Sequence, residues 1–217
     1  MKNRVIETNE GIQDQLTVEV FDVFARTMRD KGWNNVDAFL RAGIREGNVL
    51  EVGPGPGYVG LEWLKKAPGA KLTGLEISEA MIRTAERNAK AYGLEGKANY
   101  VQGNGMAMSF ADETFDAAFS NGSLHEWEKP VAVFNELWRV LKPGGTVCVA
   151  DMRRDVNPLL KWGIYATVQP RAIRPGYLSS LNAAYTVGEM TEVMRNTAFE
   201  RYTVEKNFFG LTVSATK

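Results

Sequence analysis

The chain has 217 residues, of which 44% are hydrophobic and 24% charged, a balance typical of globular proteins that excludes a disordered chain. Lys+Arg and Asp+Glu both number 26, so the sequence lacks the basic surplus typical of proteins that bind DNA or anionic membranes. One cysteine excludes an internal disulfide and a multi-cysteine zinc site. The start of the chain has no apolar run, and no window approaches about 18 consecutive apolar residues. We therefore expect a cytoplasmic, single-domain protein without a signal peptide or membrane span.

Helices are expected before the first buried strand. Thr17 is placed to cap a helix that carries Phe21 and Phe24 on one face. A shorter helix is predicted over residues 36–42. We interpret residues 1–46 as an N-terminal helical cap.

Strands alternate with helices over residues 47–152, which we interpret as a cofactor-binding core. The predicted strands are residues 49–52, 71–77, 98–102, 115–120 and 146–150. Ser78 is expected to cap one intervening helix, and Pro130 to lie in the first turn of another. A turn is predicted at residues 143–145, where Pro-Gly-Gly precedes the last of these strands. This alternation predicts βαβ crossovers, hence a mostly parallel sheet with helices on both faces.

The alternation stops over residues 153–185, where periodicity is weak. The stretch 153–174 holds five basic residues against one acid, and the segment also holds several aromatic residues. We interpret it as a substrate lid in which Arg153, Trp162 and Tyr165 are candidate substrate contacts. The alternatives are a solvated charged surface and aromatic side chains that only pack the insertion on the sheet.

Residues 186–217 are expected to form a helix, opened by a capping box at Thr186 and Glu189, and then two neighbouring antiparallel strands. The fold class predicted from all these elements is α/β. It is a Rossmann-like open sheet of about seven strands, mostly parallel with an antiparallel C-terminal strand.

A glycine-rich turn follows the first strand of the core. Gly53, Gly55 and Gly57 alternate there, at the carboxyl end of a strand where open α/β sheets bind ligands. Glycines allow a ligand to touch the backbone, and the following helix offers free N–H groups. The alternative is a tight strand-to-helix turn that binds nothing.

The type of ligand is a separate question. Residues 55–60 satisfy G-x-G-x-x-G, and Glu76 follows Gly55 by 21 residues, which is the dinucleotide fingerprint with its ribose-binding acid. Against a dinucleotide, Glu51 lies near the crevice and would repel a pyrophosphate but suit a cationic amine. Pro54 and Pro56 also remove two N–H donors from the loop. A nicotinamide-dependent oxidoreductase remains the alternative.

Five motifs in order resemble those of the class I S-adenosylmethionine-dependent methyltransferases, in the small-molecule branch called type 11. They are residues 49–57 (VLEVGPGPG), 72–78 (LTGLEIS), 100–110 (YVQGNGMAMSF), 115–121 (FDAAFSN) and 137–146 (LWRVLKPGGT). The resemblance covers about residues 46–152. It implies S-adenosylmethionine as cofactor.

The resemblance also implies roles for individual residues. The three glycines would approach the methionine part of the cofactor, and Glu51 would support its ammonium group through water. Glu76 would accept both ribose hydroxyls. The remaining cofactor contacts implied are Ile77 against the adenine, Asn104 and Gly105 near its amine, and Asn121 through its backbone carbonyl. Asn104 stands where the family usually has an aspartate, and its amide oxygen can still accept that hydrogen bond.

His125 is the only histidine, and it follows the fourth predicted strand of the core at the mouth of the expected site. Because histidine titrates near neutrality, it is the candidate base for removing a proton from the methyl acceptor. The alternative is a packing or helix-capping role. Cys148 lies in an apolar strand and is expected to be buried rather than nucleophilic.

We therefore predict an S-adenosylmethionine-dependent methyltransferase that acts on a small molecule. The alternatives are an NAD(P)-dependent oxidoreductase and a non-catalytic S-adenosylmethionine-binding protein. No metal, nucleic-acid or membrane partner is expected. Against a nucleic-acid substrate, the Pro-Cys and Asn/Asp-Pro-Pro-aromatic motifs of nucleic-acid methyltransferases are missing. The attacking atom of the acceptor and the oligomeric state stay open.

Overall fold

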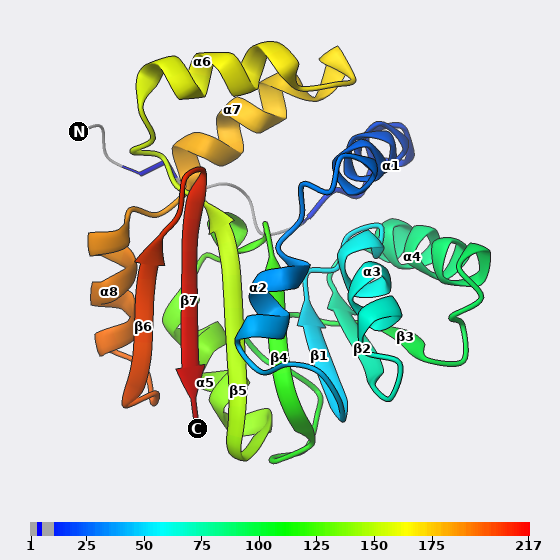
Figure 1. Ribbon diagram of the computed structural model, residues 1–217, viewed down its shortest axis with the longest axis vertical. Coiled ribbons are helices and arrows are strands. Elements are labelled where there is room, and N and C mark those ends of the chain that lie inside the picture. The colour runs from blue at the N-terminus through cyan, green and yellow to red at the C-terminus, as the bar shows by residue number, and fades with distance from the viewer. Residues whose placement is uncertain (1–3, 6–10) are drawn as a thin grey trace.

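The computed structural model describes residues 4–5 and 11–217 (Figure 1). The start of the chain, where no signal peptide is expected, lies mostly outside these residues. Within them, seven strands form one sheet in the order β3-β2-β1-β4-β5-β7-β6. The strands are β1 (Asn48–Val52), β2 (Lys71–Glu76), β3 (Ala98–Gln102), β4 (Phe115–Asn121), β5 (Leu141–Met152), β6 (Arg201–Lys206) and β7 (Gly210–Thr216).

The pairing of the strands confirms the predicted fold class. Strands β1 to β5 are parallel, while β7 is antiparallel to both β5 and β6. The chain moves from β1 outward to β3 and then returns to β4 on the other side of β1. That reversal opens a crevice at the carboxyl ends of β1 and β4, which is where ligands of such sheets bind.

Helices cover both faces of the sheet, and α1, α6 and α7 lie over its carboxyl end (Figure 1). They are α1 (Gln15–Asp30), α2 (Val36–Arg41), α3 (Tyr58–Lys66), α4 (Glu79–Ala91), α5 (Pro130–Val140), α6 (Pro158–Thr167), α7 (Arg174–Ala183) and α8 (Val187–Arg195). Helices α2, α3 and α4 share one apolar core with Val49, and α5 and α8 share another with Leu50. This division follows from the strand period of two, which turns neighbouring side chains to opposite faces.

Helix α1 begins earlier than predicted. The expected cap Thr17 is wrong, because the carboxylate of Asp14 accepts the Thr17 backbone N–H at 2.8 Å. The Thr17 hydroxyl donates to the same carboxylate at 2.6 Å, so the two side chains act together. The caps predicted at Ser78 and Thr186 are confirmed, the latter with a full capping box.

Asp22 links helix α1 to helices α3 and α4. The carboxylate of Asp22 is buried and accepts hydrogen bonds from the Tyr58 hydroxyl and the Asn88 amide, both at 3.1 Å. A buried carboxylate needs such partners, because water no longer solvates it. These bonds hold α1 over the carboxyl end of the sheet.

The structure has helices in one segment where the sequence predicted no element, and it corrects one predicted turn. The weakly periodic segment after β5 forms helices α6 and α7. Helix α6 buries no side chain, so its apolar residues need not recur on one face, and periodicity gives no signal. The turn predicted at residues 143–145 is absorbed into β5, which starts at Leu141 and shifts its register on β4 between Phe115 and Ala117.

Gly60, in the first turn of α3, allows the helix to approach the sheet closely. A β-carbon there would lie 2.1 Å from Glu51 Oε2 and 2.4 Å from Leu72 Cδ2. Because both neighbours are buried, we expect Gly60→Ala to lower the free energy of unfolding by about 1–3 kcal/mol. Urea denaturation measures this. Gly69→Ala is the control, since its β-carbon would meet nothing within 4 Å, and equal midpoints for the two variants would contradict the expectation.

Candidate functional site

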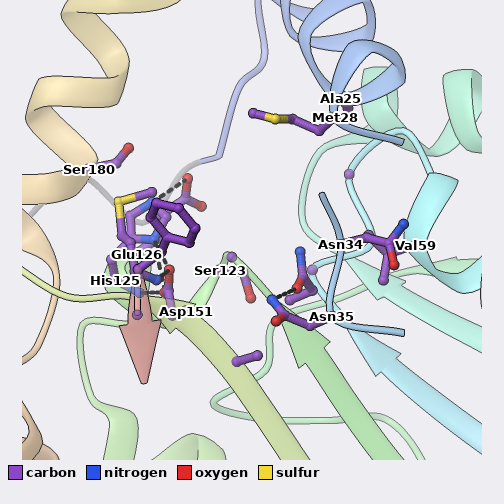
Figure 2. A pocket seen from close by; sticks show the side chains of 18 of the residues that line it. Ala25, Met28, Asn34, Asn35, Val59, Ser123, His125, Glu126, Asp151 and Ser180 are labelled. Atoms are coloured by element: carbon purple, nitrogen blue, oxygen red, sulfur yellow. Dashed lines mark hydrogen bonds and ion pairs between the residues drawn. The ribbon is translucent and has the colours of Figure 1, made fainter. Parts of the chain in front are cut away.

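A cavity of about 1730 Å³ opens at the carboxyl ends of the parallel strands. It is bounded by α1, by α6 and α7, and by the turn between β6 and β7. Figure 2 shows Ala25 and Met28 of α1 across from Ser180 of α7, with His125, Glu126 and Asp151 gathered at the base. Single ligand pockets usually measure about 300–1,000 Å³, so this cavity has room for a cofactor and a second molecule.

The cavity brings together most of the residues singled out in the sequence. Those that line it are Gly53, Gly55, Glu76, Ile77, Asn104, Gly105, Asn121 and His125. Those outside its lining are Glu51, Gly57, Arg153, Trp162 and Tyr165.

The glycine loop requires its glycines for two different reasons. Gly53, Gly55 and Gly57 all have positive φ, at 69°, 53° and 84°, which side chains rarely tolerate. In addition, a β-carbon on Gly53 would lie 2.6 Å from the Ser123 side chain, and one on Gly57 would lie 2.7 Å from the Tyr100 hydroxyl. The backbone of this loop is therefore bare on the cavity side at Gly53 and Gly55.

Glu76 ends β2 with its carboxylate on the cavity wall. Its Oε1 accepts the backbone N–H groups of Ile77 at 2.9 Å and Ser78 at 3.0 Å, and its Oε2 accepts that of Gly55 at 3.0 Å. Burial raises the pKa of Glu76, and these three hydrogen bonds oppose the rise. Because Oε1 already accepts two hydrogen bonds, Oε2 has the free site for one ligand hydroxyl, and a second hydroxyl would share Oε1 with its backbone donors.

Two asparagines on the cavity wall are already engaged. The Asn104 side-chain oxygen accepts the Met106 N–H at 2.8 Å, and the Asn121 side-chain oxygen accepts the Asn35 amide at 2.7 Å. Figure 2 shows Asn35 reaching across from the α2 side. The link between Asn35 and Asn121 had no signal in the sequence, where Asn35 only precedes the short helix predicted over residues 36–42.

Glu51 lies beneath the glycine loop and is fully buried, on the face of β1 turned toward α3. Burial first and the charge of Glu76 second raise its pKa to about 8, while the hydrogen bond from the Gly60 N–H opposes the rise. In the described part of the chain, Glu51 Oε2 and the nearby Tyr100 hydroxyl are buried without a hydrogen-bond partner. Buried polar atoms are usually satisfied, so these two atoms are exceptions to the rule.

His125 and Asp151 form a buried pair at the base of the cavity (Figure 2). The ring Nδ1 lies 2.9 and 3.1 Å from the two carboxylate oxygens, and the His125 backbone N–H donates to the same carboxylate at 2.7 Å. An ionised carboxylate only accepts, so Nδ1 carries the proton and Nε2 of the neutral ring is the basic nitrogen. The order of elements could have predicted this pair, because Asp151 lies at the carboxyl end of β5 and His125 follows the carboxyl end of the neighbouring β4.

The three candidate substrate residues lie away from the cavity. Trp162 is 71% exposed on α6, and Tyr165 has the Arg174 guanidinium 5.3 Å from its ring centre. Arg153 pairs with Asp155 at 3.1 Å. Aromatic residues of α1 occupy the wall instead, as Phe21 and Phe24 line the cavity. Cys148 is buried in β5, and burial raises its pKa to about 11, which leaves the thiol protonated.

Residues 50–149 match the family model described as "Methyltransferase domain". The chain carries a methyltransferase domain. Together with the five motifs, this match makes the chain similar to the class I S-adenosylmethionine-dependent methyltransferases, and the cofactor of that family is S-adenosylmethionine. The nicotinamide-dependent alternative finds no support in the comparisons.

Among proteins with known names, the chain is similar to the ubiquinone/menaquinone biosynthesis C-methyltransferase UbiE of Cereibacter sphaeroides. The two are 32% identical over 114 residues, which is 52% of this chain and 46% of that protein. It is 45% identical to squalene methyltransferase 1 of Botryococcus braunii over 106 residues, 49% of this chain and 27% of that protein. The matched segment thus spans about half or less of these relatives.

The fold of the methyltransferase domain is shared with a SAM-dependent methyltransferase from Aquifex aeolicus. The TM-score is 0.72 at 19% identity, over 94% of this chain and 99% of that one. The cavity fits the cofactor of the family. It offers a bare glycine backbone, a carboxylate for a diol, an apolar Ile77 and amide groups at Asn104 and Asn121.

Proposed function

We propose that this protein is an S-adenosylmethionine-dependent methyltransferase of a small apolar molecule. The observation that carries the proposal is the Glu76 carboxylate on the cavity wall, bonded at 3.0 Å to the glycine-loop backbone at Gly55. This arrangement places an acceptor for two hydroxyls beside a bare backbone, as an adenosine with an attached amino acid requires.

The cofactor would be held by the residues singled out in the sequence. Glu76 would bind the ribose, Ile77 the adenine face, and Asn104 with Gly105 the adenine edge. Gly53, Gly55 and the Asn121 carbonyl would face the methionine part. Gly57 would act indirectly, because its lack of a side chain lets the loop pass close to Tyr100. Glu51 would favour the positively charged ammonium group through its negative charge beneath the loop.

When bound, S-adenosylmethionine supplies an electrophilic methyl group on a sulfonium ion. The chain then has to align the acceptor and receive its proton. In the proposal, His125 takes that proton on Nε2, and Asp151 positions the ring and stabilises the imidazolium that forms. The buried location of both groups keeps them from competing water.

An apolar acceptor is supported by the walls of the cavity beyond the cofactor residues. They include Phe24, Met28, Ile164 and Tyr177. The named relatives act, by their names, on ubiquinone or menaquinone precursors and on squalene. We infer that residues 153–185, with α6 and α7, form the lid over this acceptor, while residues 11–46, the described main part of the N-terminal cap predicted at 1–46, close the other side.

The test is a melting experiment followed by a labelling screen. S-adenosylmethionine or S-adenosylhomocysteine at about 100 times its dissociation constant stabilises the fold by about 2.7 kcal/mol, a measurable rise in melting temperature. Cofactor labelled in its methyl group is then incubated with metabolite and lipid extracts, and the labelled product is identified. Stabilisation by NAD(H) alone would overturn the proposal. Label found only in RNA or protein would refute the small-molecule acceptor.

Glu76→Ala supplies the site-specific version of this test. Losing two charge-assisted hydrogen bonds should weaken cofactor binding by roughly 1.5–3 kcal/mol, about 10- to 150-fold. Calorimetric titration measures the affinity. Glu79→Ala, which removes an exposed carboxylate three residues later at the start of α4, is the matched control. Unchanged affinity in a folded Glu76→Ala protein would show that the ribose lies elsewhere.

The cytoplasmic location and the lack of a nucleic-acid partner stay predictions. No helix in the described residues has the length and apolar character to cross a bilayer.

A further inference from the structure

The exposed apolar side chains of the described residues concentrate at one end of the molecule. Nine large hydrophobic residues are exposed, and five of them, Trp33, Leu159, Trp162, Phe208 and Phe209, belong to the mouth of the cavity or to α6 beside it. We call these five residues the apolar rim. Their exposed fractions run from 53% at Phe209 to 82% at Leu159.

Helix α6 shows the pattern in one element. Its sequence, PLLKWGIYAT, is mostly apolar, yet none of its side chains is buried. Leu160, Gly163 and Ile164 face the cavity, while Trp162 lies outside the cavity lining and is 71% exposed. Helix α6 thus has apolar side chains on the side that faces the cavity and on the outer side, and none of them is buried. Such an exposed apolar outer side marks a surface that contacts another apolar partner.

The remainder of the rim lies at the same end of the sheet. Phe208 and Phe209 form the turn between β6 and β7, with ring centres 4.7 Å apart, and both line the cavity. Figure 1 shows this turn at the end of the sheet where α6 and α7 lie. Trp33, just after α1, lines the cavity as well.

Charge identifies what covers the rim. Residues 156–188 contain Lys161, Arg171 and Arg174 and no acidic residue, in a chain of zero net charge. Lys206 adds a cation next to the Phe208–Phe209 turn, and Glu205 is the acid beside it. Exposed tryptophan and phenylalanine among cations, around an open cavity, match the interface of an anionic bilayer, where aromatic rings lie at the headgroup level.

We propose that the apolar rim docks on the surface of an anionic lipid bilayer, with the mouth of the cavity facing the lipid. In this proposal the rim side chains are the part of the protein that enters the interface of the bilayer. The sequence-based expectation of no membrane partner rested on net charge and the lack of a span, neither of which reports exposed side chains. The docking surface is independent of methyl transfer, although it would let an apolar acceptor enter from the lipid.

The test is sedimentation with vesicles of phosphatidylcholine mixed with phosphatidylglycerol, and with vesicles of phosphatidylcholine alone, without cofactor or acceptor. The wild-type protein should bind the mixed vesicles, and less so at high salt. Leu159→Ser/Trp162→Ser/Phe208→Ser should reduce the bound fraction by about fivefold or more. Lys161→Glu/Arg171→Glu should reduce it on the mixed vesicles.

The matched controls are Trp138→Ser on α5 and Lys65→Glu on α3, both outside the lining of the cavity. Melting temperatures confirm that each variant is folded. No binding by the wild-type protein, or equal losses in the control and rim variants, would overturn the proposal. Self-association that the triple rim variant abolishes, without vesicle binding, would also overturn it and assign the rim to a second copy. Because the assay needs no turnover, its failure leaves the proposed methyl transfer untouched.

Discussion

His125→Ala is expected to reduce kcat by about 10²- to 10⁴-fold, the range typical for loss of a positioned general base. The affinity for S-adenosylmethionine should stay unchanged, because the proposed cofactor residues lie on the glycine loop and at the ends of β2, β3 and β4, and His125 is not one of them. Steady-state kinetics with the acceptor found by labelling, together with calorimetric titration of the cofactor, measure the two effects separately. Turnover at the wild-type rate in a folded His125→Ala protein would leave His125 a packing role.

Asp151→Asn tests the positioning role of the carboxylate. The pair is buried, with Nδ1 2.9 Å from Asp151 Oδ2, so an amide at this position alters which ring nitrogen holds the proton. We expect kcat to fall by at least about tenfold and the pH dependence of kcat/KM to shift, as befits a base that has lost its partner. Asp155→Asn is the control, since Asp155 pairs with Arg153 outside the cavity lining. A fall in activity with an unchanged pH profile would indicate a purely structural role for Asp151.

The parts of the site that the sequence predicted are those fixed by topology. Glu76 ends the strand next to β1, and parallel strands present their carboxyl ends at one edge, so its place beside Gly55 follows from the order of elements. The same reasoning extends to Asp151, which lies at the carboxyl end of β5, beside β4. The pairing of Asp151 with His125 was not among the predictions from the sequence.

Properties that depend on tertiary packing could not be predicted. Trp162 was expected to wall the acceptor pocket, but whether a side chain in a weakly periodic segment points inward depends on how the helix lies over the sheet. Glu51 shows the same limit. Its position before the glycines predicted a cofactor role, while its full burial under Gly60 follows from the close approach of α3.

Glu51→Gln is expected to change how stability depends on pH. The pKa of Glu51 rises from 4.5 to about 8 through burial first and the charge of Glu76 second. Above pH 4.5 the unfolded chain loses this proton while the folded chain keeps it, so stability falls as pH rises toward 8. At 1.36 kcal/mol per pKa unit, the loss is on the order of 5 kcal/mol, and it is complete above the folded pKa.

Glutamine has the shape of a protonated glutamate and does not titrate. The variant should therefore match the wild-type protein near pH 5 and be the more stable of the two near pH 8.5, as urea denaturation at both pH values will show. Glu95→Gln, which replaces an exposed carboxyl, is the control and should leave the difference in stability between the two pH values unchanged.

A cationic ammonium bound above the loop favours the ionised form of Glu51. The affinity of the wild-type protein for S-adenosylmethionine should accordingly gain more than that of Glu51→Gln as pH rises from 6 to about 8. If stability and affinity depend on pH in the same way in both proteins, the protonation of Glu51 is coupled neither to folding nor to cofactor binding.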